Sequence, residues 1–207
     1  MGRPAGPGGY ARLLAAASRG IKRADPNVGV ISAAVSQRTG GRGGTMEDVD
    51  WLDGLYQAGA KDWFDLLGMH AYLGSFAPET DPSTCSPMCF RDVERFRAVM
   101  ERNGDSWKQA FITEVGVLEQ TSVDLGPYAW MRLAPDTRAD YLVRALQMAN
   151  DNYRWIRGAM VYNFDAATVP WTPNTSEKFW FSPLNANGTA RLALDRLTAA
   201  RHDGRLT

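Results

Sequence analysis

The segment Gln109-Ala-Phe-Ile-Thr-Glu-Val-Gly116 is the most informative part of this sequence for its fold. It joins a short apolar run to a single acid, and this is the pattern of a buried strand of a parallel sheet. Such a strand delivers Glu114 at its carboxyl end, where Gly116 allows the backbone to turn away sharply. We therefore expect a strand over residues 109–114 with its acid at the rim of the sheet.

Similar strand patterns occur before and after this one, and helical patterns separate them. The predicted strands cover residues 28–35, 64–70, 109–114 and 158–164. The predicted helices cover residues 10–22, a short stretch around Trp51, and residues 90–102, 136–152 and 189–201, with Asp136 as an N-cap. A glycine-rich loop is expected over residues 39–44. Strands that alternate with amphipathic helices predict an α/β fold with about four parallel strands.

The length limits how much of a fold the chain can hold. At 207 residues we expect one domain over residues 1–207. A complete (β/α)₈ barrel needs about 250 residues. The chain is therefore expected to be a small open α/β sheet or half a barrel.

Composition excludes several classes of partner. Lys plus Arg equals Asp plus Glu at 23 each, and the basic residues are scattered, so no nucleic-acid partner is expected. No apolar run approaches the roughly 20 residues of a membrane span. The start, Met1-Gly-Arg-Pro, lacks the apolar region of a secretory signal. Because the N-terminus looks truncated, the missing signal does not decide the localisation. An extracellular localisation is among the alternatives.

Two cysteines, Cys85 and Cys89, lie four positions apart with Pro87 between them. A disulfide that closes a small loop and two free thiols are equally good interpretations. A metal site is the weaker one, because no second pair of Cys or His residues accompanies them.

Three strand ends carry a resemblance to a known family. They are His70-Ala-Tyr72, Thr113-Glu-Val-Gly116 and Val161-Tyr-Asn-Phe164. In this order they resemble the C-terminal half of clan A glycoside hydrolases related to families 5 and 39, which include cellulases. The resemblance extends from about Tyr10 onward and implies a partial (β/α)₈ barrel with strands equivalent to five to eight.

The resemblance implies a retaining O-glycosyl hydrolase that acts on a β-glycoside or polysaccharide without a cofactor or metal. Glu114 matches the nucleophile, which would carry the covalent glycosyl-enzyme intermediate. Tyr72 matches the tyrosine that donates a hydrogen bond to the nucleophile, and His70 would belong to the same polar wall. Tyr162 stands where many members have tryptophan.

Further contacts are expected from the loops. Trp171 is the preferred aromatic residue for stacking on a sugar. Asp165 ends the last strand and is the best second carboxylate, although a role in ordering its loop is an equal alternative. A buried structural histidine is the competing interpretation of His70. Asp65 opens its strand and is expected to be structural.

One element of the family pattern is missing from the sequence. The general acid/base belongs to an Asn-Glu pair at the end of strand four, and no Asn-Glu occurs here. We therefore expect a fragment that is inactive alone and that associates with itself or rearranges through its open half-barrel edges. The alternative is a non-catalytic carbohydrate-binding domain or a degenerate remnant of a barrel.

Overall fold

The computed structural model describes residues 6–37 and 46–206 of the chain. The glycine-rich loop expected over residues 39–44 lies outside them. The helices and strands follow one another along the chain in this order: α1 Pro7–Ala24, α2 Asp48–Gln57, η1 Ala60–Trp63, β1 Leu66–His70, η2 Phe90–Asp92, α3 Val93–Arg102, β2 Gln109–Val115, β3 Leu118–Glu119, η3 Gly126–Met131, β4 Arg132–Leu133, α4 Pro135–Asn152, β5 Ile156–Val161, α5 Glu177–Phe181 and α6 Leu192–His202.

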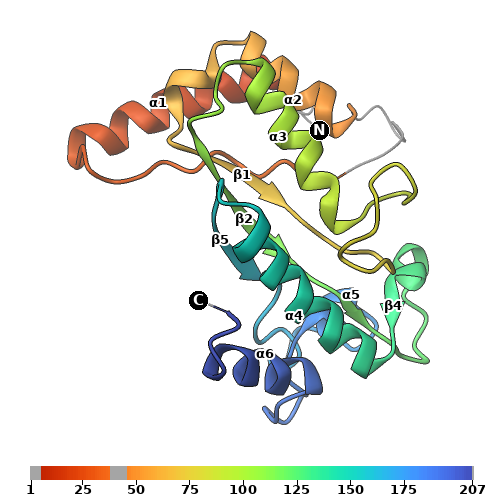
Figure 1. Ribbon diagram of the computed structural model, residues 1–207. Coiled ribbons are helices and arrows are strands. Elements are labelled where there is room, and N and C mark those ends of the chain that lie inside the picture. The colour runs from red at the N-terminus through yellow and green to blue at the C-terminus, as the bar shows by residue number, and fades with distance from the viewer. Residues whose placement is uncertain (1–5, 38–45, 207) are drawn as a thin grey trace.

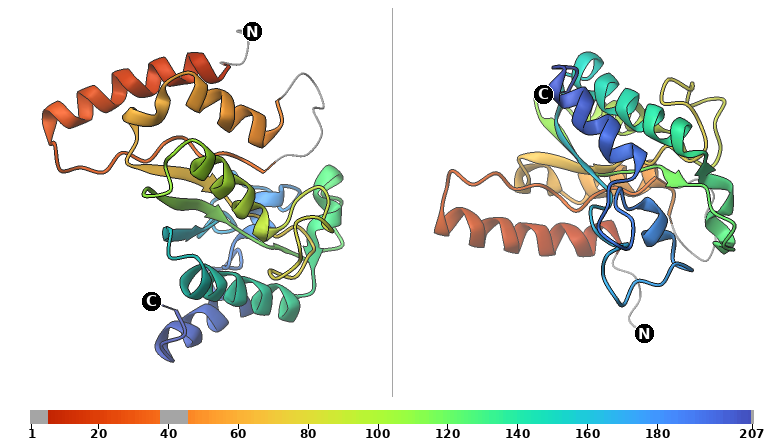
Figure 2. Two further views of the ribbon diagram at one scale, coloured as in Figure 1. Left: turned by 45° about the horizontal axis from the view of Figure 1, so that its top comes forward. Right: turned by 90° about the horizontal axis from the view of Figure 1, so that it is seen from below.

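The main sheet has three strands in the order β1-β2-β5, and both pairings are parallel. Helix α3 connects β1 to β2 and helix α4 connects β2 to β5, as parallel neighbours require. Helices α1 to α3 gather beside β1, whereas α4 and α6 pack together beside β5 (Figures 1 and 2). An α/β fold with a parallel sheet is therefore confirmed.

The predicted strand over residues 28–35 is wrong as a continuous strand. The segment runs beside β1 but forms only the isolated parallel bridges Ile31↔Leu66 and Val35↔Met69. Between them, the Ser32 hydroxyl accepts the Gly68 amide at 3.0 Å, so a side chain replaces a backbone partner in the ladder. A Cβ at Gly68 would lie 2.4 Å from the Ser32 carbonyl oxygen, so only glycine allows this close approach.

Several predicted boundaries move by a few residues. Asp136 is not the N-cap of α4, because Ala134 holds that position and Pro135 begins the helix. Proline suits this first position, since its amide would lack a helical partner and its φ is already helical. Asp136 instead lies in the first turn, where its charge complements the helix dipole. Asp65 precedes β1, and its carboxylate accepts the Val30 amide and pairs with Lys22, as expected for a structural acid.

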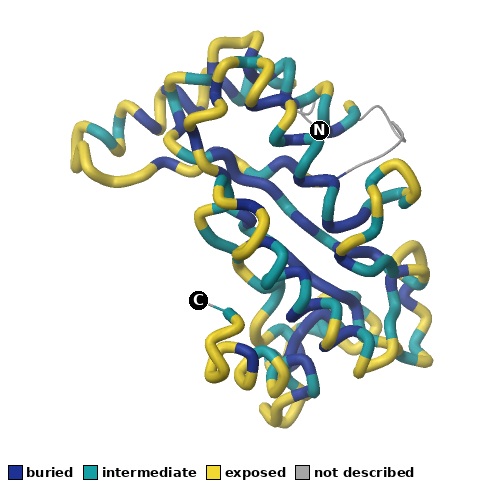
Figure 3. The backbone as a smooth tube through the Cα atoms, in the orientation of Figure 1, coloured by how far each residue is buried: buried dark blue, intermediate teal, exposed yellow. Residues whose placement is uncertain are grey.

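The core and the edge of the sheet differ sharply in exposure. Buried residues follow β1, β2 and the inner faces of the helices, whereas every residue of β5 is intermediate or exposed (Figure 3). Strand β5 is the last strand of the sheet, and within the described residues no further strand pairs with its outer edge. Met160 on this strand is 55% exposed. Such an edge permits pairing with another chain, and self-association stays a prediction.

Candidate functional site

The carboxyl ends of β1, β2 and β5 bring four of the predicted residues together, namely His70, Tyr72, Glu114 and Tyr162. The Ala71 amide donates to the Glu114 carbonyl at 2.8 Å, and the Tyr162 amide donates to the Val115 carbonyl at 2.8 Å. These bonds place Tyr72 and Tyr162 on either side of Glu114. In parallel α/β sheets, ligands bind at the carboxyl ends of the strands.

The carboxylate of Glu114 has two polar neighbours from β1. The Tyr72 hydroxyl donates a hydrogen bond to Oε2, and Nδ1 of His70 lies 3.5 Å from the same oxygen. The Glu114 side chain is 31% exposed. Its carboxylate therefore contacts Tyr72 and His70 on one side and solvent on the other.

Burial sets the protonation states of these neighbours. Burial lowers the pKa of His70 below its ordinary value of 6.5, although the Glu114 charge opposes the shift. Burial, together with the hydrogen bond to Glu114, raises the pKa of Tyr72 above its ordinary value. At neutral pH, Tyr72 therefore remains a protonated donor and His70 is mainly uncharged.

Three aromatic rings stand edge to face beside this carboxylate. The ring centroid of Tyr72 lies 5.9 Å from that of Tyr162 and 5.5 Å from that of Phe181. Tyr162 and Phe181 are 5.6 Å apart. Edge-to-face contacts at these distances fix the ring orientations. Gly116 makes the packing possible, because a Cβ there would lie 2.9 Å from the Tyr162 carbonyl oxygen.

These groups line an open pocket of about 310 Å³. The lining residues are Ser36, His70, Tyr72, Met88, Glu114, Tyr128, Met131, Tyr162, Glu177 and Phe181. Glu177 is a second carboxylate that the sequence did not single out. It lies in the first turn of α5, which Ser176 caps, and no lysine or arginine occurs among the described lining residues.

Two of the predicted contacts lie elsewhere. The Trp171 side chain does not line this pocket and is 80% exposed. Asp165 is exposed as well, and its carbonyl accepts hydrogen bonds from the amide and hydroxyl of Thr168. These bonds involve the backbone of Asp165, so the role of its carboxylate stays a prediction, as does contact of Trp171 with a substrate.

A buried arginine ties the loop after Glu114 to α5. Arg138 of α4 donates to the Val117 carbonyl at 3.0 Å and to the Phe181 carbonyl at 2.7 Å. It also pairs with Glu119 at 2.7 Å, and Arg191 pairs with the second oxygen of that carboxylate. This network holds the two segments that carry Glu114 and Glu177 against each other.

The cysteines form a disulfide, Cys85–Cys89. In the described part of the chain, one group of three potential metal ligands has its donor atoms within 4.8 Å of one another, namely Cys85, Cys89 and Asp92. Two of these are consumed by the disulfide, which leaves too few ligands for an ordinary metal site. No described helix is long and apolar enough to cross a membrane.

Several solved structures of glycoside hydrolases are similar to this chain in fold. No protein-family model and no curated protein matches the chain. A glucosidase from Croceicoccus marinus is similar, with a TM-score of 0.59 and 16% identity over 88% of this chain and 33% of its own. An endo-β-1,3-glucanase of family GH128 from Sorangium cellulosum has a TM-score of 0.58 and 17% identity over 93% of this chain and 62% of its own.

The fold resembles part of a glycoside hydrolase barrel. An exo-β-agarase gives the same result, with a TM-score of 0.60 and 12% identity over 97% of this chain and 23% of its own. The chain thus spans less than two thirds of each of these proteins. At such identities the similarity concerns the fold, and it agrees with the predicted partial barrel.

Lowering the pH is expected to destabilise the fold through His70. The folded-state pKa of His70 lies below 6.5, so the unfolded chain binds the proton more readily. The contribution of neutral His70 to the free energy of unfolding is therefore complete above pH 6.5, and it is lost as the pH falls below 6.5. The loss cannot exceed about 1.4 kcal/mol per pH unit, which is the contribution of one proton.

Urea unfolding at pH 7 and pH 5, of the wild type and of His70→Asn, measures this effect. The wild type should lose more unfolding free energy between the two pH values than the variant. Equal losses would show that His70 does not carry the shift.

Proposed function

We propose that this chain is the nucleophile-bearing part of a retaining O-glycosyl hydrolase, with Glu114 as the nucleophile. One observation carries the proposal: the Glu114 carboxylate accepts the Tyr72 hydroxyl at the carboxyl end of β2 and faces an open pocket. The donated hydrogen bond orients the carboxylate that would attack an anomeric carbon. The three aromatic rings give a surface on which the apolar face of a sugar can pack.

In the proposed reaction, Glu114 attacks the anomeric carbon and the glycosidic oxygen leaves with the electrons of the broken bond. That oxygen needs a proton from a second carboxyl group, which retaining enzymes hold about 5 to 5.5 Å from the nucleophile. The Asn-Glu pair that supplies it in the related family does not occur in this sequence. We therefore assign the acid/base to no residue of this chain, and we expect its turnover of ordinary glycosides to be on the order of 10² to 10⁴-fold slower for that reason.

The proposal predicts a test that bypasses the missing acid. Dinitrophenolate leaves without being protonated, so an aryl β-glycoside with this leaving group still allows attack by Glu114. A β-glucoside, a β-xyloside and a β-galactoside would be compared. The expected result is a burst of dinitrophenolate that approaches one equivalent per chain with at least one of them, followed by slow turnover.

The alternative is a non-catalytic carbohydrate-binding domain or a degenerate remnant of a barrel. The absence of Asn-Glu from the sequence favours it. Binding of a β-linked oligosaccharide without any burst would support this alternative, and absence of both would contradict a carbohydrate function.

Glu177 is proposed to bind hydroxyl groups of the sugar and to disfavour anionic sugars. Both carboxylates of the pocket, Glu114 and Glu177, would repel a uronate, and no described lining residue is a lysine or arginine that could attract one. Hydrogen bonds to a charged group contribute about 1.5 to 3 kcal/mol. Laminaripentaose, a neutral β-1,3-linked glucose oligosaccharide, serves as the test ligand. Glu177→Gln should weaken its binding about tenfold or more. The ratio of its affinity to that of a glucuronate oligosaccharide should become smaller, because one repelling charge is removed.

Titration calorimetry with both ligands measures this preference, and Asp165→Asn is the matched control. Asp165 is an acid near the end of β5 that lies outside the pocket lining, so its replacement should change neither affinity. An effect of Asp165→Asn without an effect of Glu177→Gln would instead support Asp165 as the second carboxylate of the site.

A further inference from the structure

Gln37 holds both backbone polar groups of Tyr72. Its side-chain oxygen accepts the Tyr72 amide at 2.5 Å, and its side-chain nitrogen donates to the Tyr72 carbonyl at 3.2 Å. Gln37 is only 2% exposed. A buried amide that bonds both sides of one residue fixes the backbone of that residue, and hence the direction of its side chain.

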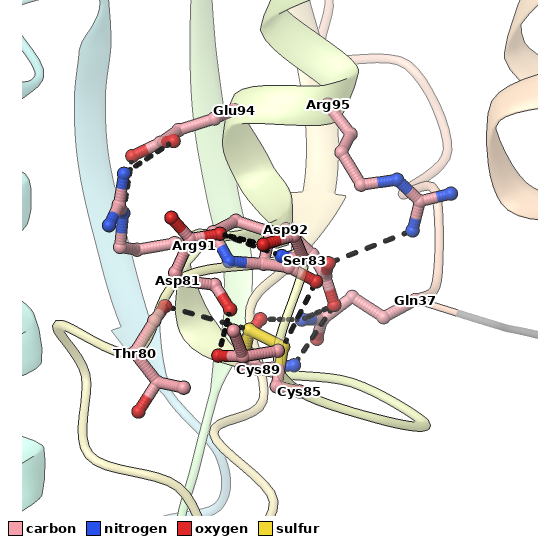
Figure 4. Close-up of a disulfide and its surroundings, with 12 residues drawn as sticks. Gln37, Thr80, Asp81, Ser83, Cys85, Cys89, Arg91, Asp92, Glu94 and Arg95 are labelled. Atoms are coloured by element: carbon pink, nitrogen blue, oxygen red, sulfur yellow. Dashed lines mark hydrogen bonds and ion pairs between the residues drawn. A yellow bond between two sulfur atoms is a disulfide. The ribbon is translucent and has the colours of Figure 1, made fainter.

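The same amide reaches the disulfide loop. The Gln37 side-chain nitrogen donates to the Cys89 carbonyl at 2.6 Å. Figure 4 shows Gln37 beside Cys89 and Asp92, at the point where the loop enters η2. Gln37 therefore links Tyr72, which donates to Glu114, to Cys89, which forms the disulfide.

The loop between the two cysteines forms part of the pocket wall. Met88 lies inside the loop that the Cys85–Cys89 disulfide closes, and its side chain lines the pocket. Met88 also packs against the small apolar cluster that includes Phe181. The disulfide restricts the conformations of this short loop and so restricts where Met88 can lie.

The far end of the loop is anchored independently of the disulfide. The Asp92 carboxylate accepts the Cys89 amide at 2.9 Å, and Arg95 lies 3.6 Å from the same carboxylate (Figure 4). Arg95 in turn pairs with Asp48 of α2 at 3.0 Å. The position of Cys89 is thus fixed by Asp92, and both the Gln37 side chain and the disulfide are attached to Cys89.

We propose that Gln37 and the disulfide loop of residues 85–89 act together as a positioning device for the pocket, here called the Gln37 clamp. Gln37 holds the Tyr72 hydroxyl against Glu114, and the disulfide holds Met88 as the wall that limits the ligand on that side. The use of this device in sugar binding rests on the proposed function. The placement of Tyr72 and Met88 by this device does not rest on the proposed function. The positioning role and the proposed function can therefore fail separately.

Replacing Gln37 with methionine tests the first half of the clamp. The variant keeps a side chain of similar length but leaves the amide and carbonyl of Tyr72 without their buried partner, which is costly. The Tyr72 ring should then leave Glu114 part of the time. Gln57→Met is the matched control, because Gln57 is an exposed glutamine at the end of α2.

The readout is the ¹³Cζ resonance of Tyr72 in the full chain labelled on tyrosine, assigned by its absence in Tyr72→Phe. We expect this resonance to shift or broaden in Gln37→Met and to stay unchanged in Gln57→Met. The burst rate with the reactive aryl β-glycoside should fall about tenfold in Gln37→Met, as expected for a lost hydrogen bond. An unchanged Tyr72 resonance in a Gln37→Met chain that still melts cooperatively would overturn the proposal.

Reduction of the wild-type chain tests the second half and does not depend on folding of a variant. A water-soluble phosphine reduces the disulfide to two thiols and becomes the phosphine oxide, with water supplying the oxygen and the protons. The expected result is a shift of the Met88 methyl resonance, assigned by Met88→Leu. If titration shows two thiols per chain and this resonance has not moved, the disulfide does not position the wall.

Discussion

Replacing Glu114 with glutamine is expected to abolish the burst of dinitrophenolate and to lower its steady release by on the order of 10⁴-fold or more. The amide keeps the shape of the side chain and can still face Tyr72, but it is not a nucleophile for the anomeric carbon. Rapid-mixing absorbance measurements with the reactive aryl β-glycoside check this result.

Tyr72→Phe is the matched control for that variant. It removes the hydroxyl that donates to Glu114 and leaves the ring that packs on Tyr162 and Phe181. The burst should persist but become about ten- to a hundredfold slower, because a hydrogen bond to a charged group contributes about 1.5 to 3 kcal/mol. A burst that survives in Glu114→Gln at the wild-type rate would show that another group attacks.

Replacing Arg138 with methionine is expected to lower the free energy of unfolding by about 3 to 5 kcal/mol, as is typical when one partner of a buried charged network is removed. Arg138 is 1% exposed and donates to three backbone carbonyl oxygens as well as to Glu119. Its loss leaves these acceptors without their donor. Urea unfolding followed by circular dichroism measures the change.

Arg144→Met is the control for Arg138→Met on the same helix. Arg144 pairs with Glu79 and Asp140, but its side chain is 38% exposed, so its loss should cost less than about 1 kcal/mol. A similar cost for both variants would show that the Arg138 network contributes no more than a surface ion pair.

The sequence predicts the parts of this fold that depend on local pattern. Apolar runs ending in an acid or a tyrosine place Glu114 and Tyr72 at neighbouring strand ends, and the structure brings these two side chains into contact. The strand predicted over residues 28–35 is different, because the Ser32 hydroxyl competes for the Gly68 amide. Competition of this kind depends on which segments become neighbours, and periodicity does not contain that information.

The remaining parts of the site depend on contacts between distant segments. Glu177 reaches the pocket because Arg138 holds Phe181 and Ser182 near the loop after Glu114. Ser176 followed by an acid marks the start of a short helix, but it does not indicate where that helix packs. The sequence pattern predicts a strand that Asp165 ends, but β5 ends at Val161, before that residue.

The most direct test of Glu114 as the nucleophile is the mass of the protein after incubation with a 2-deoxy-2-fluoro-β-glycosyl fluoride. Fluoride leaves without strong acid assistance, and the fluorine at C2 slows hydrolysis of the glycosyl-enzyme, so the intermediate accumulates. We expect one fluoroglycosyl group per chain, located on Glu114 by peptide mapping and absent from Glu114→Gln. A wild-type chain that stays unlabelled, or that carries the group on another residue, would contradict it.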